Sequence, residues 1–161
     1  QRLADYARFC GADGILYTCS AFGPAIEAVQ QKVLVPVLKP NEAMFREAIS
    51  RGGKIVLLVT FEPSVAPLRA EFDALSEGRN IALQTVLVEK AMAALASGDA
   101  ATHNRLIAEA AQKTDGAETI VLAQFSMAQA RPAVEAVTSV PVLTAPDSAV
   151  LAMRPHFDQS D

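Results

Sequence analysis

A cysteine is the residue of this sequence with the clearest chemical potential. Cys19 follows an apolar run, residues 15–17, and precedes Gly23 and Pro24, which suit the first turn of a helix. This order predicts a buried parallel strand, a sharp turn that carries the thiol, and then a helix. The amino end of a helix holds carboxylates and lowers the pKa of a nearby thiol below its free value of about 8.5. Cys19 is therefore a candidate proton donor and acceptor, and the alternative is a small buried apolar residue.

The stretch around Cys19 occurs twice. A shift of 105 residues carries residues 11–15 onto 116–120 and residues 35–38 onto 140–143, with no gap between the two anchors. The helix between the anchors keeps its length and its apolar face. The repeat is therefore a strand-turn-helix-strand unit, and two such units predict two halves that pack about a pseudo-twofold axis.

The repeat places Gln124 at the position equivalent to Cys19. Gln124 follows a second apolar run, residues 119–123, and precedes Phe125 and Ser126. If a twofold axis relates the halves, the two turns face each other across one site. We therefore include Gln124 and Ser126 with Cys19 as candidate catalytic residues, and Phe125 as a candidate substrate contact.

Other polar residues also fall at the carboxyl ends of predicted strands. Each has a common role in capping or in turns, but their shared edge makes the set more informative. The set consists of Thr18, Ser20, Asn41, Thr60, Ser64 and Thr144. The edge is rich in neutral hydrogen-bond donors and helix starts and poor in Lys and Arg. Such a pocket suits a small carboxylate, and the sequence makes Asn41, Thr60 and Ser64 candidate binding residues.

The elements that must position these residues alternate between strands and helices. Strands are expected at 15–17, 35–39, 55–59 and 81–88. Helices are expected at 24–32, 43–50, 65–75 and 90–112, and residues 97–99 divide the last of these into two. The second copy of the repeat covers residues 119–144. The alternation predicts an α/β fold with parallel sheets and right-handed crossovers. We expect residues 1–50, completed by 145–161, to form one half and residues 51–144 the other. A predicted strand precedes the second unit, and the sequence before the first unit has no counterpart of it. We therefore expect an amino-terminal strand and helix to precede Gln1.

The composition argues against several classes of protein. The sequence has 161 residues, of which 51% are hydrophobic, and a formal net charge of −4 without a cluster of Lys or Arg, which argues against a nucleic-acid or anionic-membrane partner. No apolar run approaches the roughly 20 residues of a membrane-spanning helix. Cys10 has an expected structural role in a helix core, and no Cys or His pair has metal-ligand spacing, so neither a disulfide framework nor a zinc site is expected. We expect a cytoplasmic protein.

These motifs resemble the aspartate/glutamate/hydantoin racemase superfamily, which also includes arylmalonate decarboxylase and maleate isomerase. The resemblance rests on the residues around Cys19, on Val-Pro-Val-Leu38, and on the strands that end at Thr60 and Gln124, and it covers nearly the whole chain. It implies two pseudo-symmetric α/β halves with the active site between them, catalysis without a cofactor, and a homo-oligomer as one option. It also implies that one thiolate removes the proton α to a carboxylate while a second thiol supplies a proton on the other face.

The resemblance assigns carboxylate binding to Thr60 and to the backbone amides of Ser20 and Ala21. The sequence departs from the family at the second cysteine, because Gln124 stands there and an amide has no proton that titrates near neutral pH. Ser126 could stand in, although nothing in the sequence is placed to activate it. Three alternatives remain open: a racemase or isomerase of a small amino acid, hydantoin or dicarboxylic acid; a one-sided decarboxylase with Gln124 as a hydrogen-bond donor; and a non-catalytic carboxylate-binding domain.

Overall fold

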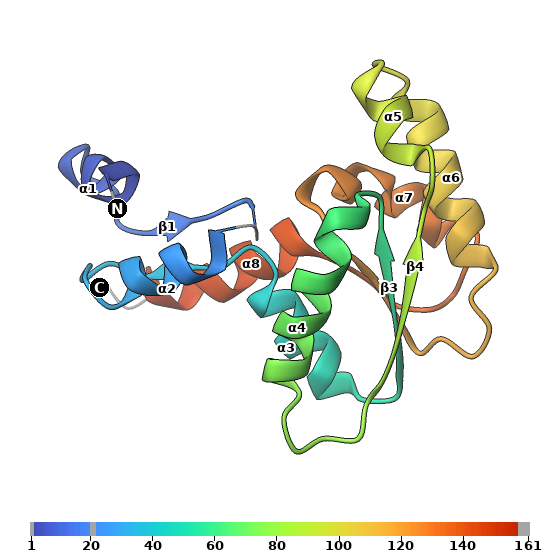
Figure 1. The fold of residues 1–161 in the computed structure, drawn as a ribbon, viewed down its shortest axis with the longest axis horizontal. Helices are drawn as coiled ribbons and strands as arrows, with labels where there is room; N and C mark the ends of the chain where they lie inside the picture. Colours follow the sequence, from blue (N-terminus) through green and yellow to red (C-terminus); the bar gives the residue numbers. More distant parts are fainter. Residues whose placement is uncertain (1, 20–21, 158–161) are drawn as a thin grey trace.

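The centre of the structure is a four-stranded parallel sheet of mostly apolar strands. The computed structural model describes residues 2–19 and 22–157. In spatial order, the strands are β4 (Ala82–Leu87), β3 (Lys54–Val59), β5 (Thr119–Leu122) and β6 (Val142–Thr144) (Figure 1). The middle strands β3 and β5 are nearly continuous apolar runs because helices cover both of their faces. Since all four strands are parallel, their carboxyl ends meet at one edge of the sheet.

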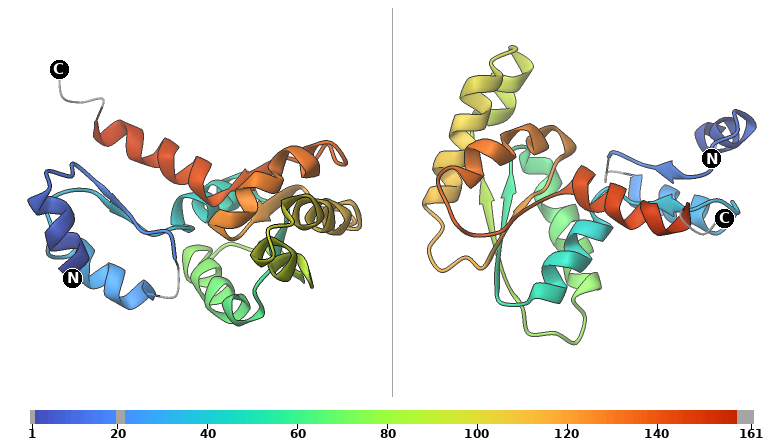
Figure 2. Two further views of the ribbon diagram at one scale, coloured as in Figure 1. Left: turned by 90° about the horizontal axis from the view of Figure 1, so that it is seen from above. Right: turned by 180° about the vertical axis from the view of Figure 1, so that it is seen from behind.

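Helices pack on both faces of this sheet. One face carries α3 (Glu42–Arg51) and α4 (Val65–Leu75), and the other carries α5 (Ala91–Ala96), α6 (Ala100–Gln112) and α7 (Arg131–Glu135) (Figure 2). Phe45 of α3 and Phe72 of α4 form an edge-to-face ring pair with centroids 5.6 Å apart. These helices lie close to their expected bounds, so the predicted α/β class with parallel sheets is confirmed.

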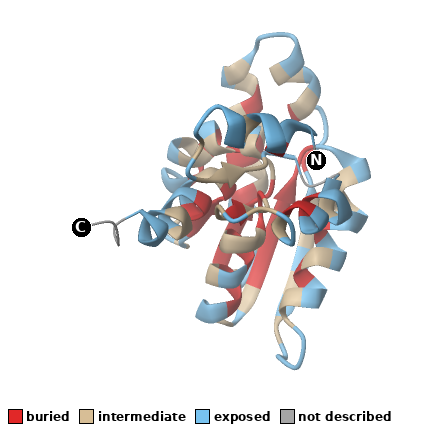
Figure 3. Ribbon diagram, turned by 90° about the vertical axis from the view of Figure 1, so that its left-hand side faces the viewer, coloured by how far each residue is buried: buried red, intermediate tan, exposed pale blue. Residues whose placement is uncertain are grey.

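A smaller lobe carries the candidate cysteine. Its sheet has two parallel strands, β1 (Ile15–Leu16) and β2 (Val37–Leu38), and its core includes Ile26 and Val29 of α2 (Gly23–Gln30). The helix α1 (Arg2–Phe9) lies beyond β1. The strand before Cys19 is only half-buried, not buried as predicted, because β2 alone pairs with it in the described chain. Figure 3 shows the contrast between the buried large sheet and the more exposed small lobe.

Cys10 lies just after α1 and is exposed, so the expectation that it faces a helix core is wrong. The physical reason is that the described chain packs little against α1: Leu3, Tyr6 and Phe9 of this helix are also exposed.

The repeat in the sequence is confirmed by the register of the strands. Ile15 pairs with Val37, and the N–H of Ile15 donates at 2.8 Å to the carbonyl of the residue before Val37. In the second unit, Ile120 pairs with Val142, and the N–H of Ile120 donates at 2.9 Å to the carbonyl of the residue before Val142. The two units therefore share the same strand pairing and the same hydrogen bond, 105 residues apart.

The helices that follow the two units cross between the lobes. α3 follows the small sheet but packs against the large one, whereas α8 (Ala145–Met153) follows the large sheet, packs against α3 and extends alongside the small lobe (Figures 1 and 2). A Cβ atom placed on Gly14, just before β1, would lie 3.1 Å from the sulfur of Met153. Two exchanged helices thus connect the lobes, and the expected division of the chain after residue 50 stays a prediction.

Candidate active site

A pocket of about 300 Å³ lies at the carboxyl ends of the strands, between the two lobes. Five of the residues that the sequence proposes for a site line this pocket. They are Cys19, Asn41, Ser64, Gln124 and Phe125. The first follows a strand of the small sheet, and the other four follow strands or begin helices of the large lobe. Strand ends of two different sheets therefore bring residues that are far apart in the sequence to one pocket.

Gln124 is held in one orientation by the neighbouring strand. Its Oε1 accepts a hydrogen bond from the backbone N–H of Thr60 at 3.1 Å, and the Thr60 hydroxyl donates to the same oxygen at 3.4 Å. The amide Nε2 of Gln124 is buried and has no hydrogen-bond partner in the described chain. A buried donor without an acceptor costs about 1–3 kcal/mol, and an oxygen of a bound ligand would remove that cost. Gln124 thus gives the pocket a fixed donor.

Asn41 takes the expected position before α3, but its side chain does not cap the helix. The residue is 2% exposed, and its Oδ1 has no hydrogen-bond partner. Its side chain interacts instead with the carboxylate of Glu71 on α4. Burial raises the pKa of the Glu71 carboxyl, while the Lys39 ammonium and the Asn41 amide lower it in part. Asn41 therefore connects the pocket wall to a half-buried carboxylate.

The thiol of Cys19 belongs to the small-lobe side of the pocket. Cys19 is exposed, so its alternative role as a small buried apolar residue is excluded. The helix α2 begins at Gly23 with Pro24 in its first turn, as predicted. Ser64 precedes α4, and its hydroxyl makes no capping hydrogen bond. A thiol, a hydroxyl and an amide are thus available to a ligand in the same pocket.

Two other proposed site residues, Thr60 and Ser126, do not line the pocket. Thr60 is buried and supports Gln124 through the hydrogen bonds above. Ser126 is exposed in the 3-10 helix η3 (Phe125–Ala130). Consecutive residues of such a helix are about a third of a turn apart, so Phe125 can face the pocket while Ser126 does not. Ser20 and Ala21 lie outside the described residues.

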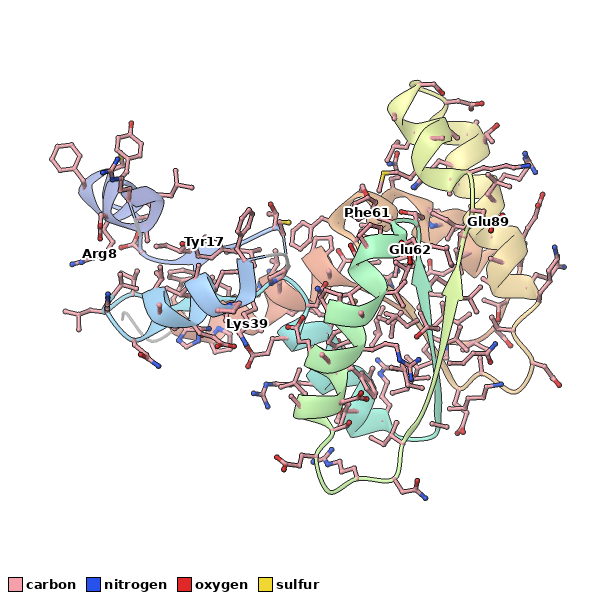
Figure 4. All side chains as sticks on the ribbon, in the orientation of Figure 1. Arg8, Tyr17, Lys39, Phe61, Glu62 and Glu89 are labelled. Carbon is pink, nitrogen blue, oxygen red and sulfur yellow. The ribbon has the colours of Figure 1, made fainter. Side chains whose placement is uncertain are left out.

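The sequence did not single out several residues of the pocket wall. They are Pro40, Phe61, Pro63, Pro67 and Met92. Figure 4 shows Phe61 at the upper ends of β3 and α4. Phe61 and the prolines lie close to strand ends, and this position was a usable signal. Met92 comes from α5, and no local pattern marks it, because its place in the pocket depends on how α5 packs.

The pocket wall contains no charged side chain among the described residues. The same part of the chain holds no group of three or more His, Cys, Asp or Glu residues that could bind a metal ion. In residues 2–19 and 22–157, no helix has the length and apolar character needed to cross a membrane. A carboxylate in this pocket would therefore be held by neutral donors and by helix starts.

Solved structures of two kinds of enzyme share the fold. Glutamate racemase RacE1 from Bacillus anthracis matches with a TM-score of 0.67 and 12% identity over 98% of this chain and 63% of that chain. Glutamate racemase from Francisella tularensis, in complex with D-glutamate, matches with a TM-score of 0.70 and 13% identity over 96% of this chain and 60% of that chain. A cysteine variant of arylmalonate decarboxylase with associated sulfate matches with a TM-score of 0.67 and 18% identity over 98% of this chain and 72% of that chain.

The chain thus spans 63% and 60% of the lengths of the two glutamate racemases. No curated protein sequence matches it significantly. The family model for Asp/Glu/hydantoin racemase matches residues 2–153, which is nearly the whole chain, and this match confirms the resemblance found in the sequence. The chain therefore belongs to the Asp/Glu/hydantoin racemase family.

Proposed function

We propose that the chain catalyses proton transfer at the carbon α to a carboxylate of a small substrate, without a cofactor, and that Cys19 carries the proton. The observation that carries the proposal is the pocket in which the exposed thiol of Cys19 and the unpartnered Nε2 of Gln124 occur together. Both kinds of related enzyme, glutamate racemase and arylmalonate decarboxylase, are named for carboxylate substrates.

The roles follow from what each group can do. Gln124 donates a hydrogen bond from Nε2 to a carboxylate oxygen, and the Ser64 hydroxyl supplies a further donor. When the α proton leaves, its electron pair moves onto the carboxylate, and an enediolate forms. The same donors stabilise the added charge on the carboxylate. Cys19 accepts the proton as a thiolate and returns it as a thiol.

The side chains of the pocket that can carry a proton favour proton transfer on one face of the substrate. The position equivalent to Cys19 holds Gln124, whose amide neither gains nor loses a proton near neutral pH. Proton removal and return by Cys19 alone therefore restores the starting configuration. This proposal gives no role to Ser126, which lies outside the pocket.

The same set of side chains favours, as a second candidate, decarboxylation followed by protonation on one face. Loss of carbon dioxide from a substituted malonate leaves the electron pair on the α carbon, which gives the same enediolate. The Cys19 thiol then protonates one face, and the thiolate recovers a proton from water. A carboxylate-binding domain without catalysis is the candidate from a different class, because binding needs Gln124 and Ser64 but not the thiol.

Deuterium exchange separates these candidates. The chain is incubated in deuterated water with a panel of amino acids, hydantoins and substituted malonates, and the α position is followed by NMR. The matched variants are Cys19→Ser and Cys10→Ser, since both cysteines are exposed but only Cys19 lines the pocket. We expect exchange or decarboxylation in the wild type and in C10S and its loss in C19S.

The outcomes assign the function. Exchange with retained configuration supports proton transfer by Cys19 alone, and release of carbon dioxide with deuterium on one face identifies a decarboxylase. Exchange that persists unchanged in C19S removes Cys19 from the mechanism. Binding of a carboxylate without any exchange or decarboxylation supports the binding domain and contradicts the catalytic proposal.

A further inference from the structure

A second cavity adjoins the candidate active site. Its volume is about 430 Å³, and it is lined by residues of α2 in the small lobe and α4 in the large lobe, which face each other in Figures 1 and 2. Pro40 and Pro67 line both cavities, so the two spaces meet at these residues. Most of the remaining wall is apolar, including Pro24, Ala74 and Leu75. A cavity with this wall suits the aliphatic part of a small ligand.

Three charged side chains interrupt the apolar wall. Lys39 and Glu27 form an ion pair, with 2.6 Å between Nζ and Oε1, and Figure 4 shows Lys39 on the side of the small lobe near α3 and α4. Glu71, on α4, forms no ion pair in the described chain. Its Oε1 is buried and has no hydrogen-bond partner there. The cavity wall therefore includes a carboxylate with one oxygen that lacks a donor in the described chain.

The surroundings of Glu71 do not make up for this lack. Burial raises the pKa of the Glu71 carboxyl, and the Lys39 ammonium and the Asn41 amide lower it only in part. The Lys39 ammonium is already engaged with Glu27, and the nearby carboxylates of Glu27 and Glu42 add negative charge. A cation that entered this cavity would replace lost solvation and would give Oε1 its missing donor.

We propose that this cavity is the side-chain subsite of the candidate active site and takes an aliphatic chain that ends in an ammonium group, so that the substrate is a basic amino acid. The inference rests on the proposed function, which holds the substrate carboxylate and α carbon near Gln124 and Cys19. The aliphatic part of the side chain passes Pro40 and Pro67, and the terminal ammonium donates to Oε1 of Glu71. The candidate active-site pocket has a neutral wall, so it offers no carboxylate to an ammonium group. In the second cavity, the carboxylate of Glu27 is already paired with Lys39, so Glu71 is the carboxylate that remains for the ammonium.

The test compares two amino acids with the same number of carbon atoms. The last side-chain carbon carries the ammonium in L-lysine and a hydrogen in its place in L-norleucine. Dissociation constants for both are measured by calorimetry or by NMR titration with the wild type, with Glu71→Gln, and with Asp73→Asn as a control on the exposed face of the same helix. We expect the wild type and D73N to bind lysine at least about tenfold more tightly than norleucine, as a charged hydrogen bond requires.

In E71Q the preference for lysine should fall below about threefold, while the dissociation constant of norleucine stays unchanged. The amide of Gln is close in shape to the carboxylate, and circular dichroism with thermal unfolding confirms that the variant is folded. An equal affinity of the wild type for the two amino acids, a preference that survives in E71Q, or no detectable binding of lysine would each overturn the subsite.

Deuterium exchange on the same ligands separates this inference from the proposed function. Exchange of both amino acids that depends on Cys19, without a preference for lysine, retains the proposed chemistry and overturns the subsite. Binding of lysine that depends on Glu71, without exchange of any compound in the panel, retains the cation site and overturns the chemistry.

Discussion

The side-chain oxygen of Gln124 accepts a hydrogen bond from the backbone N–H of Thr60 at 3.1 Å and so joins the carboxyl ends of β5 and β3. The same contact leaves Nε2 of Gln124 buried without a hydrogen-bond partner in the described chain, in a residue that lines the pocket. At the equivalent position of the first unit, Cys19 is exposed and carries a thiol. The two units therefore use one position of the repeat in two ways: Gln124 supports the sheet edge through its oxygen, and Cys19 supplies an exposed thiol.

Replacement of Gln124 by Leu should destabilise the fold. The backbone N–H of Thr60 would lose its acceptor, and a buried donor left without a partner costs about 1–3 kcal/mol. The free energy of unfolding, measured by urea denaturation, should fall by an amount at the lower end of that range, about 1 kcal/mol, because Leu also removes the unpartnered Nε2 donor. Gln129→Leu is the control, because Gln129 is exposed and should change the same quantity by less than about 0.5 kcal/mol. Equal losses in the two variants would contradict the role of Gln124.

Replacement of Gln124 by Cys should allow protonation on the second face of the substrate. A thiol at this position would supply the proton that the amide cannot, so an enediolate formed with the aid of Cys19 could be protonated from either side. With a substrate that exchanges in the wild type, we expect Q124C to produce both enantiomers, measured by chiral chromatography. Ser126→Cys places a thiol outside the pocket and should leave the product with one configuration. The same single enantiomer from Q124C would argue against a two-sided pocket.

Local pattern and the repeat were enough to predict the strand ends. The apolar runs fix β3 and β5, and the shift of 105 residues relates the pairing of Ile15 to that of Ile120. Because the repeat places Cys19 and Gln124 at equivalent strand ends of two halves expected to face each other about a pseudo-twofold axis, the two residues could be assigned to one pocket before any contact was known.

Packing over long sequence distances could not be predicted in the same way. The place of Met92 in the pocket wall depends on the position of α5, and the half-exposed state of β1 depends on how few elements cover the small sheet. The charge of Glu71 looks like that of any exposed helical carboxylate until α2 is placed opposite α4. These features depend on how whole helices and strands pack against one another. The residues next to each position in the sequence do not indicate that packing.

The two glycines before β3 should respond differently to replacement by Ala. Both have positive φ values, 76° for Gly52 and 71° for Gly53, so each Ala variant should lose about 1 kcal/mol of stability or more. A Cβ atom on Gly52 meets open space, whereas one on Gly53 would overlap the carboxylate of Glu118, which accepts the backbone N–H of Lys54 at 3.0 Å. Thermal unfolding should therefore show a larger decrease in Tm for G53A than for G52A. Equal decreases in the two variants would mean that Glu118 moves away at no cost.

Replacement of Thr144 by Val should weaken the start of α8. The Thr144 hydroxyl accepts the backbone N–H of Asp147 at 3.3 Å and donates to the carboxylate of Asp147 at 2.6 Å. Loss of such a cap costs about 1 kcal/mol, which urea denaturation should detect, and Ser139→Ala on the exposed surface should cost much less.

The effect of T144V should also depend on pH. The Thr144 hydroxyl, with help from Arg131, holds the pKa of Asp147 below its ordinary value of 3.8. A lowered pKa in the folded state adds stability that is present above 3.8 and is lost as the pH falls through the folded pKa. The stability difference between the wild type and T144V should therefore shrink in acid. A difference that is constant with pH would show that the hydroxyl acts on the backbone alone.

Glu71 should produce the opposite dependence on pH. Burial raises the pKa of its carboxyl above the ordinary value of 4.5, so the folded chain binds this proton more tightly than the unfolded chain does. Stability must then fall as the pH rises through the interval between 4.5 and the raised pKa. Glu71→Gln has no proton to lose, so its free energy of unfolding should increase relative to that of the wild type between about pH 4 and about pH 7. Urea denaturation at both pH values measures the change, with Asp73→Asn as the exposed control on α4. A relative stability of E71Q that stays constant or decreases over this interval would mean that the carboxylate is better solvated than its burial between α2 and α4 allows.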